Sequence, residues 1–308
     1  MRKLVVIFLA LLSASVVYAQ GDLHLFDVNN KDGKITSLSI EKTLNENGFS
    51  TGVRSEMNGP FKKQFQQTDF KSFTLLTIYH TKLSPKLVLK HPDAGVITPM
   101  GVGIYQKLND DTLHLSILTA KTQAKILGIK DDEILKSIER DLLKAIKKAM
   151  PKSHHKYSEN ALKNANKLLT KYELELDEDS DSDEVLDELE MNLEAGFNPF
   201  GFIIPASAYY NDVLTKNDTV ESPFDFYKTY SICKLEVIYT VARSRPEAAA
   251  FAPCTTMVYR KKGENKVIMG FPSVYNWLSS VNIEDKAAKA VLIKAQTNFE
   301  SILQEIVE

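Results

Sequence analysis

The chain contains a segment that recurs at a constant offset of 154 residues. Residues 91–107 and 245–261 share a Pro-acid-Ala opening and a Tyr-x-Lys ending. The same offset extends without a gap over more than fifty residues, which is hard to obtain by chance. Because a fixed internal period is the signature of duplicated units, the sequence predicts two homologous domains. The identical pairs in the core of the repeat are Pro92/Pro246, Ala94/Ala248, Pro99/Pro253, Tyr105/Tyr259 and Lys107/Lys261.

Both halves follow one order of predicted elements. Each begins with a short helix, at residues 39–47 and 184–195, followed by Gly48 or Gly196 where a helix end favours positive φ. Each closes with a long amphipathic helix, because apolar residues recur every three or four positions within 134–145 and 288–306. Between them lie segments rich in β-branched and aromatic residues, which predict strands at 72–80, 96–107 and 112–118, and at 226–240, 251–261 and 266–270.

This order of predicted helices and strands indicates an α+β fold of two tandem domains. Each domain is expected to be a small, mainly antiparallel sheet covered on one face by two helices. The expected boundaries are 20–151 for the first repeat domain and 184–308 for the second.

The segment between the copies, residues 152–183, is expected to be a helical and acidic linker. Leu162, Ala165, Leu169 and Tyr172 are spaced as on one side of a helix. The acidic run at 177–184 could be a loose calcium site or a solvated, self-repelling linker. His154 and His155 lack a third ligand at metal spacing, so we expect no metal site and no cofactor.

The first nineteen residues have the pattern of a secretory signal peptide. Arg2 and Lys3 precede an apolar run, and Val17-Tyr18-Ala19 places small residues where a signal peptidase reads them. The apolar stretch is shorter than the ~20 residues that cross a bilayer comfortably. We therefore expect cleavage after Ala19, a periplasmic or secreted protein, and no membrane span in the mature chain.

The predicted export bears on the redox state of the two cysteines, Cys233 and Cys254. Thiols outside the cytoplasm tend to oxidise, so the pair is a candidate disulfide. If the intervening chain reverses near residues 243–249, the two sulfurs could face each other on neighbouring strands. The alternatives are inert buried thiols or a redox or sulfur-carrying pair, with Arg243 or Arg245 lowering a thiol pKa.

The second half is rich in aromatic residues, which form either a core or a ligand groove. We take Arg245, Tyr259 and Trp277 as candidate binding residues.

The second copy resembles the domain-of-unknown-function family 302. The resemblance is carried by the Pro-acid-Ala segment running into Ala252-Pro253-Cys254, by the strand Val258-Tyr259, and by Cys233 on the preceding strand. The first copy departs from this pattern, because Met100 and Tyr79 stand where the cysteines stand. The resemblance implies a small α+β domain with helices packed on an antiparallel sheet, and it implies no particular activity.

Composition and motifs narrow the function classes. The formal net charge is −2, which gives no global field for nucleic acid. The chain has no Gly-x-Ser-x-Gly, phosphate loop, dinucleotide fingerprint or zinc-protease motif. The sequence favours a non-catalytic exported protein that binds an unidentified ligand or protein partner at the seam between its domains. The alternative is a thiol redox or sulfur-handling protein that uses Cys233 and Cys254.

Overall fold

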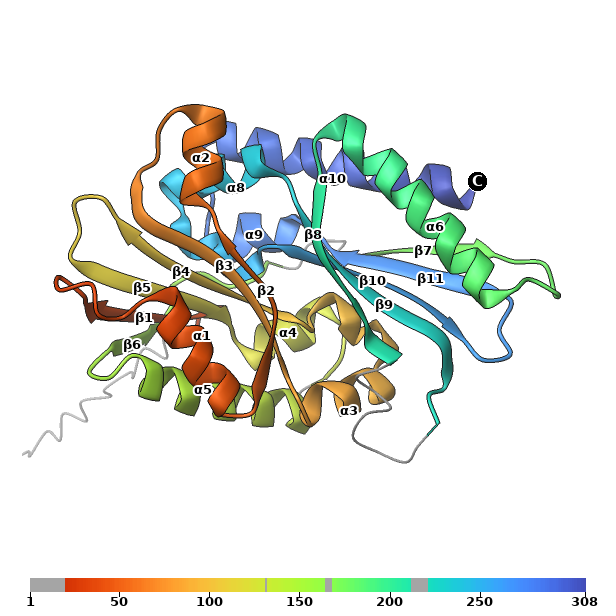
Figure 1. The fold of residues 1–308 in the computed structure, drawn as a ribbon, viewed down its shortest axis with the longest axis horizontal. Coiled ribbons are helices and arrows are strands. Elements are labelled where there is room, and N and C mark those ends of the chain that lie inside the picture. The colour runs from red at the N-terminus through yellow and green to blue at the C-terminus, as the bar shows by residue number, and fades with distance from the viewer. Residues whose placement is uncertain (1–19, 131, 164–167, 212–220) are drawn as a thin grey trace, which may run out of the picture.

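The computed structural model describes residues 20–130, 132–163, 168–211 and 221–308, so the predicted signal peptide lies outside the described residues. The described chain forms two antiparallel sheets with helices (Figure 1). The elements of the first half are β1 (Leu23–Asn29), α1 (Ser37–Glu46), β2 (Phe49–Glu56), α2 (Asn58–Phe65), β3 (Phe70–His80), α3 (Leu83–Lys90), the 3₁₀ helix η1 (Pro92–Val96), β4 (Met100–Lys107), β5 (Thr112–Leu118), α4 (Ala120–Ile126), α5 (Glu133–Ala149) and β6 (His154–Tyr157). Those of the second half are β7 (Leu169–Glu175), α6 (Ser182–Phe197), η2 (Asn198–Phe200), β8 (Ile203–Tyr209), β9 (Phe224–Cys233), α8 (Leu235–Ser244), η3 (Pro246–Phe251), β10 (Cys254–Lys261), β11 (Lys266–Pro272), α9 (Tyr275–Ser280) and α10 (Lys286–Val307).

The two sheets have the same strand order. Sheet A runs β2-β3-β4-β5-β1-β6, and sheet B, read from its β8 edge, runs β8-β9-β10-β11-β7. Each strand of sheet B therefore has a counterpart in sheet A, and β6 is an additional edge strand. The α+β fold predicted from the sequence is confirmed.

The pairing of the central strands follows the offset of the repeat. In sheet A Phe73 lies opposite Tyr105, and in sheet B Tyr227 lies opposite Tyr259. Ile78 and Met100 are paired in the same way as Ile232 and Cys254. The spacing of 154 residues in the sequence is thus a spacing of equivalent positions in the two sheets.

The correspondence at the opening helices differs from the one expected. Gly196 lies inside α6, and the glycine with positive φ is Gly201, at +73°. Its counterpart is Gly48, at +92°, because Gly48-Phe49 and Gly201-Phe202 each lead into the edge strand. The helix-ending signal therefore belongs to Gly201, since α6 continues to Phe197 and a short 3₁₀ turn follows.

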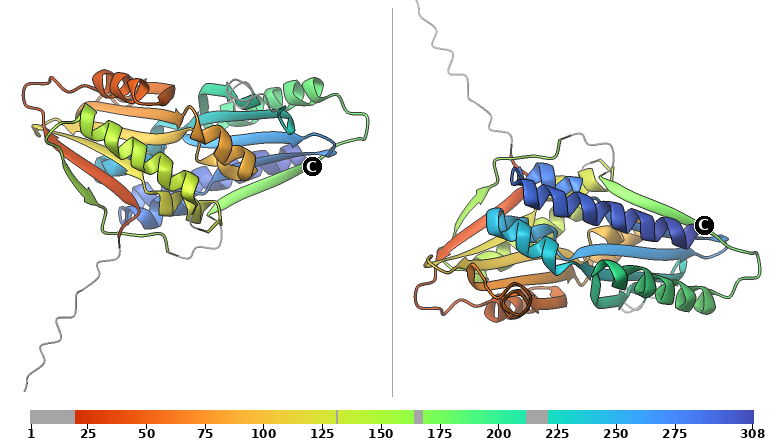
Figure 2. Two further views of the ribbon diagram at one scale, coloured as in Figure 1. Left: turned by 90° about the horizontal axis from the view of Figure 1, so that it is seen from below. Right: turned by 90° about the horizontal axis from the view of Figure 1, so that it is seen from above.

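Helices lie on the outer sides of the two sheets. The view from below shows α5 and α3 in the foreground, and the view from above shows α10, α8 and α6 (Figure 2). The two long helices begin at aspartate caps, because Asp132 accepts hydrogen bonds from the backbone of Ile134 and Leu135, and Asp285 from that of Ala288.

Two segments have a different structure from the predicted one. Leu169–Glu175 is strand β7, not a helix, because Thr170, Tyr172 and Leu174 alternate with charged residues at a period of two. The segment 152–183 therefore contributes edge strands to both sheets, and Ala165 lies outside the described residues. Residues 235–240, expected to continue a strand, begin helix α8, whose apolar residues face the core.

Candidate functional site

The two halves meet at a reciprocal contact, which we call the seam. The 3₁₀ helix η1 of the first half packs on β10 and β11, and η3 of the second half packs on β4 and β5. These 3₁₀ helices are the Pro-acid-Ala segments of the repeat. The segments in which the two halves are most similar in sequence are therefore the ones that hold the halves together.

Glycines allow the close approach of the halves on both sides of the seam. A Cβ atom on Gly103 in β4 would lie 2.4 Å from the Cβ of Ala249, and one on Gly95 in η1 would lie 2.9 Å from the Cβ of Met257. The two contacts occupy equivalent positions, with the glycine on the strand in one and on the 3₁₀ helix in the other. Such distances leave no room for a second side chain, so the halves approach to backbone contact.

Two hollows open along the seam. The first, which we call the Tyr259 cleft, has a volume of about 320 Å³. It is lined from both halves by Lys90, His91, Pro92, Asp93, Leu127, Ile129, Lys171, Tyr259 and Lys261. Sites for small molecules usually measure roughly 300–1,000 Å³, so this cleft can hold a small ligand.

The polar centre of the Tyr259 cleft is the carboxylate of Asp93. It accepts a hydrogen bond from the Tyr259 hydroxyl at 3.2 Å and pairs with the Lys171 ammonium at 2.9 Å. Burial raises the pKa of Tyr259, and the neighbouring Asp93 raises it further, so the phenol keeps its proton. Three elements, η1, β7 and β10, thus position one connected polar group.

A buried carboxylate, that of Asp132, lies next to the residues that line the cleft. Asp132 is 3% exposed and accepts from Lys90 at 2.6 Å and from His91 at 3.0 Å. Burial opposes its ionisation, but these two bonds and the backbone bonds of the α5 cap outweigh it and hold the pKa of Asp132 well below its usual range. The carboxylate is therefore ionised and fixes Lys90 and His91 at the rim.

The second hollow, the Glu247 cleft, measures about 250 Å³. It is lined by Leu25, Lys156, Tyr157, Ser158, Glu159, Asn160, Arg245, Glu247, Ser280 and Val281. Glu247 occupies the position in this cleft that Asp93 occupies in the Tyr259 cleft. The position equivalent to Lys171 is occupied by Leu25, so Glu247 has no lysine there to pair with. Burial raises the pKa of Glu247, although Arg245 and Lys107 oppose the shift.

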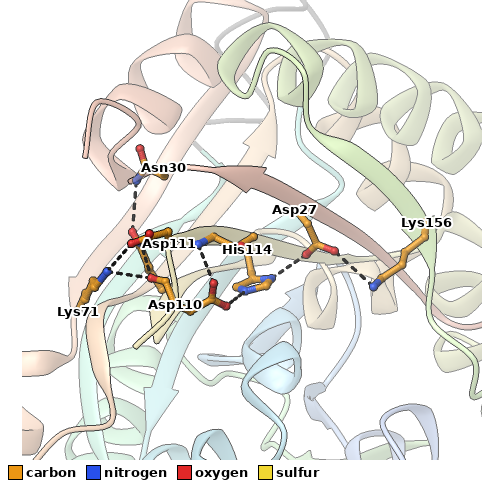
Figure 3. A network of polar contacts seen from close by, with 9 residues as sticks. Asp27, Asn30, Lys71, Asp110, Asp111, His114 and Lys156 are labelled. Carbon is orange, nitrogen blue, oxygen red and sulfur yellow. Dashed lines mark hydrogen bonds and ion pairs between the residues drawn. The ribbon is translucent and has the colours of Figure 1, made fainter. Parts of the chain in front are cut away.

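A network of charged side chains crosses sheet A beside this cleft (Figure 3). The His114 ring lies 2.7 Å from Asp27 and 3.1 Å from Asp110, and Lys156 pairs with Asp27 at 3.3 Å. Burial opposes protonation of the ring, but the two carboxylates outweigh it and raise the pKa of His114. Because both ring nitrogens are engaged, His114 has no free nitrogen to act as a general base.

The strand β6 that borders the Glu247 cleft is held by a histidine cluster. The buried His24 ring lies 2.9 Å from His155 of β6 and 2.8 Å from Glu139 of α5. His155 also stacks on Phe26, with ring centroids 4.5 Å apart. The attachment of this additional edge strand therefore includes titratable groups.

The two cysteines do not form the candidate disulfide. Both thiols are free. The register pairs Cys254 with Ile232 and leaves Cys233 one position away, and the chain between them forms α8 and η3 instead of a simple reversal. Burial raises the pKa of the Cys254 thiol to about 12, and it also raises the pKa of Cys233. The thiol alternative is therefore not favoured, because catalytic and redox cysteines need a lowered pKa.

The cysteines border a small apolar cavity that also contacts Trp277. Its volume is about 40 Å³, which admits only a few waters. Trp277 is 3% exposed and its ring stacks against Phe251 at 5.7 Å, so it is a core residue.

The structure separates the three candidate binding residues. Tyr259 lies in the first cleft, Arg245 in the second, and Trp277 in the core of the second half. Sequence reasoning did not select Lys171 because its segment had been assigned to a helix. The alternation of residues 169–175 was the signal that could have placed it.

Within the described ranges, no three His, Cys, Asp or Glu side chains are grouped so that they could hold a metal ion. No described helix is long and apolar enough to cross a membrane.

Together the sheets, seam and clefts define a two-sheet α+β protein with hollows between its halves. Residues 178–306 match the family "Domain of unknown function DUF302". A similar solved structure is that of an uncharacterized conserved protein DUF302 from Bacillus stearothermophilus, with 16% sequence identity and a TM-score of 0.33, covering 41% of this chain and 94% of that chain. No curated protein matches the chain. The family match therefore covers the second half.

Proposed function

We propose that the protein is an exported, non-catalytic binding protein that holds a small ligand in the Tyr259 cleft. The observation that carries this proposal is the size and lining of that cleft. Its volume of about 320 Å³ falls within the range of small-molecule sites, and both halves contribute polar groups to it. Two smaller cavities are too small for a ligand: one of about 30 Å³ between the halves, and one of about 40 Å³ between sheet B and helices α8 and α10.

We also propose that the first half is a divergent copy of the family domain that the second half contains. The common strand order and the common register of the central strands support this. In this proposal, duplication produced the seam, and the divergence of the two copies made the two clefts chemically different. Export rests on the signal-peptide pattern of residues 1–19.

Native mass spectrometry of the mature protein, purified from its own host, tests the binding function. We expect a retained small molecule in the wild type and its loss in Ile129→Trp, because the larger ring fills the Tyr259 cleft that Ile129 lines. The matched control is Glu159→Trp, which places the same ring in the Glu247 cleft. A ligand-free wild type across growth conditions, or equal retention in both variants, would overturn the assignment.

A further inference from the structure

The side chains that line the Tyr259 cleft are unequal in charge. Among the described residues that line it, Lys90, Lys171 and Lys261 contribute three ammonium groups and Asp93 the one carboxylate. Asp93 is already engaged by Lys171 and by the Tyr259 hydroxyl. The lining therefore offers more positive charge than its own carboxylate can neutralise.

The other two lysines are paired with carboxylates, but their side chains remain partly exposed. Lys90 pairs with the buried Asp132, but its own side chain is 55% exposed. Lys261 lies 3.4 Å from Glu264, and the two side chains are 40% and 37% exposed. Exposed pairs of this kind contribute only ~0–1 kcal/mol, so an incoming anion can replace Glu264 at small cost.

The second cleft shows that this surplus is not a general property of the seam. At the position of Lys171 it has Leu25, and its lining contains two carboxylates, Glu159 and Glu247, beside Lys156 and Arg245. The shape of the contact is repeated, but the positive surplus is present on one side alone.

From this difference we infer that the ligand of the Tyr259 cleft is a small anion with two or more negative charges, of the phosphate or polycarboxylate class. The inference rests on the proposed binding function and names its ligand class. Lys261 and Lys90 approach the anion from the two halves, and Lys171 and the Tyr259–Asp93 pair lie between them. A multivalent anion gains from bridging lysines of both halves, whereas chloride carries a single charge and gains less from the same groups.

Isothermal titration with inorganic phosphate and with citrate, at low and constant ionic strength, tests this inference. We expect at least one of the two anions to bind the wild type, chloride to compete weakly, and Lys261→Gln to weaken binding about tenfold or more. The matched control is Lys107→Gln, because Lys107 occupies the equivalent position on β4 beside the other cleft. Lys171→Leu, which copies Leu25, should also weaken binding.

The comparison of phosphate with citrate distinguishes the two kinds of anion. Failure of both to bind the wild type, or equal weakening by Lys107→Gln and Lys261→Gln, would overturn the anion assignment. Native mass spectrometry separates this result from failure of the binding function, because a retained neutral or cationic ligand that Ile129→Trp excludes would leave the proposed function standing.

Discussion

The hydroxyl group of Tyr227 lies 2.5 Å from the carbonyl oxygen of Pro92 and joins the two halves at a fully buried point. The same hydroxyl accepts a hydrogen bond from the backbone nitrogen of Gly95 at 2.9 Å. The counterpart of Tyr227 in the first half is Phe73, so this polar bridge exists on one side of the seam only. The seam is thus symmetric in shape and asymmetric in hydrogen bonding.

Removing this hydroxyl should loosen the seam. Tyr227→Phe keeps the ring but leaves the Pro92 carbonyl and the Gly95 nitrogen without this partner, which should lower the free energy of unfolding by about 1–3 kcal/mol. Chemical denaturation measures the change. Tyr275→Phe, at a ring that is 37% exposed, is the control and should be near neutral. Equal stability of both variants would mean that the bridge does not stabilise the protein.

A methyl group at the close contact should also be costly. Gly103→Ala would place a Cβ 2.4 Å from that of Ala249, so the seam must open, at a cost of about 1–3 kcal/mol. Gly59→Ala is the control, because apart from its chain neighbours nothing lies within 4 Å of its Cβ, so the added methyl group meets no residue of the other half. Thermal unfolding should separate the two variants, and no difference between them would contradict the packing described.

Glu247 should make stability depend on pH in a predictable direction. Burial raises its pKa in the folded protein, so its contribution to stability is complete below the ordinary carboxyl range and is lost as pH rises through the folded value. Glu247→Gln cannot ionise and should be more stable than the wild type at neutral pH, by up to about 1 kcal/mol. Unfolding curves from pH 4 to 8 test this, and a variant that loses stability relative to wild type toward neutral pH would contradict it.

His155 should make stability depend on pH in the direction opposite to Glu247. Burial lowers its pKa, and the positive charges of His24, Lys147 and His154 lower it further, while Glu139 opposes them. The contribution of His155 to stability is therefore complete above the ordinary imidazole pKa, and it is lost as the pH falls through the lowered pKa of His155 in the folded protein. His155→Gln should cost about 0.5–1.5 kcal/mol at pH 7 through the lost contact with His24, and less at pH 5. The exposed neighbour provides the control, His154→Gln, and a constant difference across this range would refute the assignment.

The thiols should be unreactive in the native protein. Because only the thiolate attacks, a pKa of about 12 at Cys254 slows its reaction with a disulfide reagent near neutral pH by roughly a thousandfold. Two thiols should be counted after denaturation, and the intact mass should be that of the reduced chain. Rapid native labelling of either cysteine would restore the redox alternative.

The sequence predicted the fold better than the site. Tyr105 and Tyr259 were aligned from the repeat alone, and both pair across the central strands in that register. The local pattern determines such elements, since alternation and helical spacing are read within a few residues. The seam depends instead on contacts between residues far apart in the chain, such as Gly103 with Ala249, which no local period encodes.

The site shows the same division. Tyr259 could be selected because aromatic residues are common in ligand sites, but its partner Asp93 belongs to the other half of the chain. The role of Lys171 could not be predicted, because residues 162–172 were expected to form a helix in the linker. The pairing of β7 with β11 is what brings it to the cleft.

The presence of Leu25 in one cleft and Lys171 in the other has a consequence for how such a protein can change. In a symmetric homodimer each substitution is repeated in both subunits, so one pocket cannot be altered without the other. Here both clefts belong to one polypeptide, so a single substitution changes the lining of one cleft only. The lining of one cleft can therefore stay the same while the lining of the other changes.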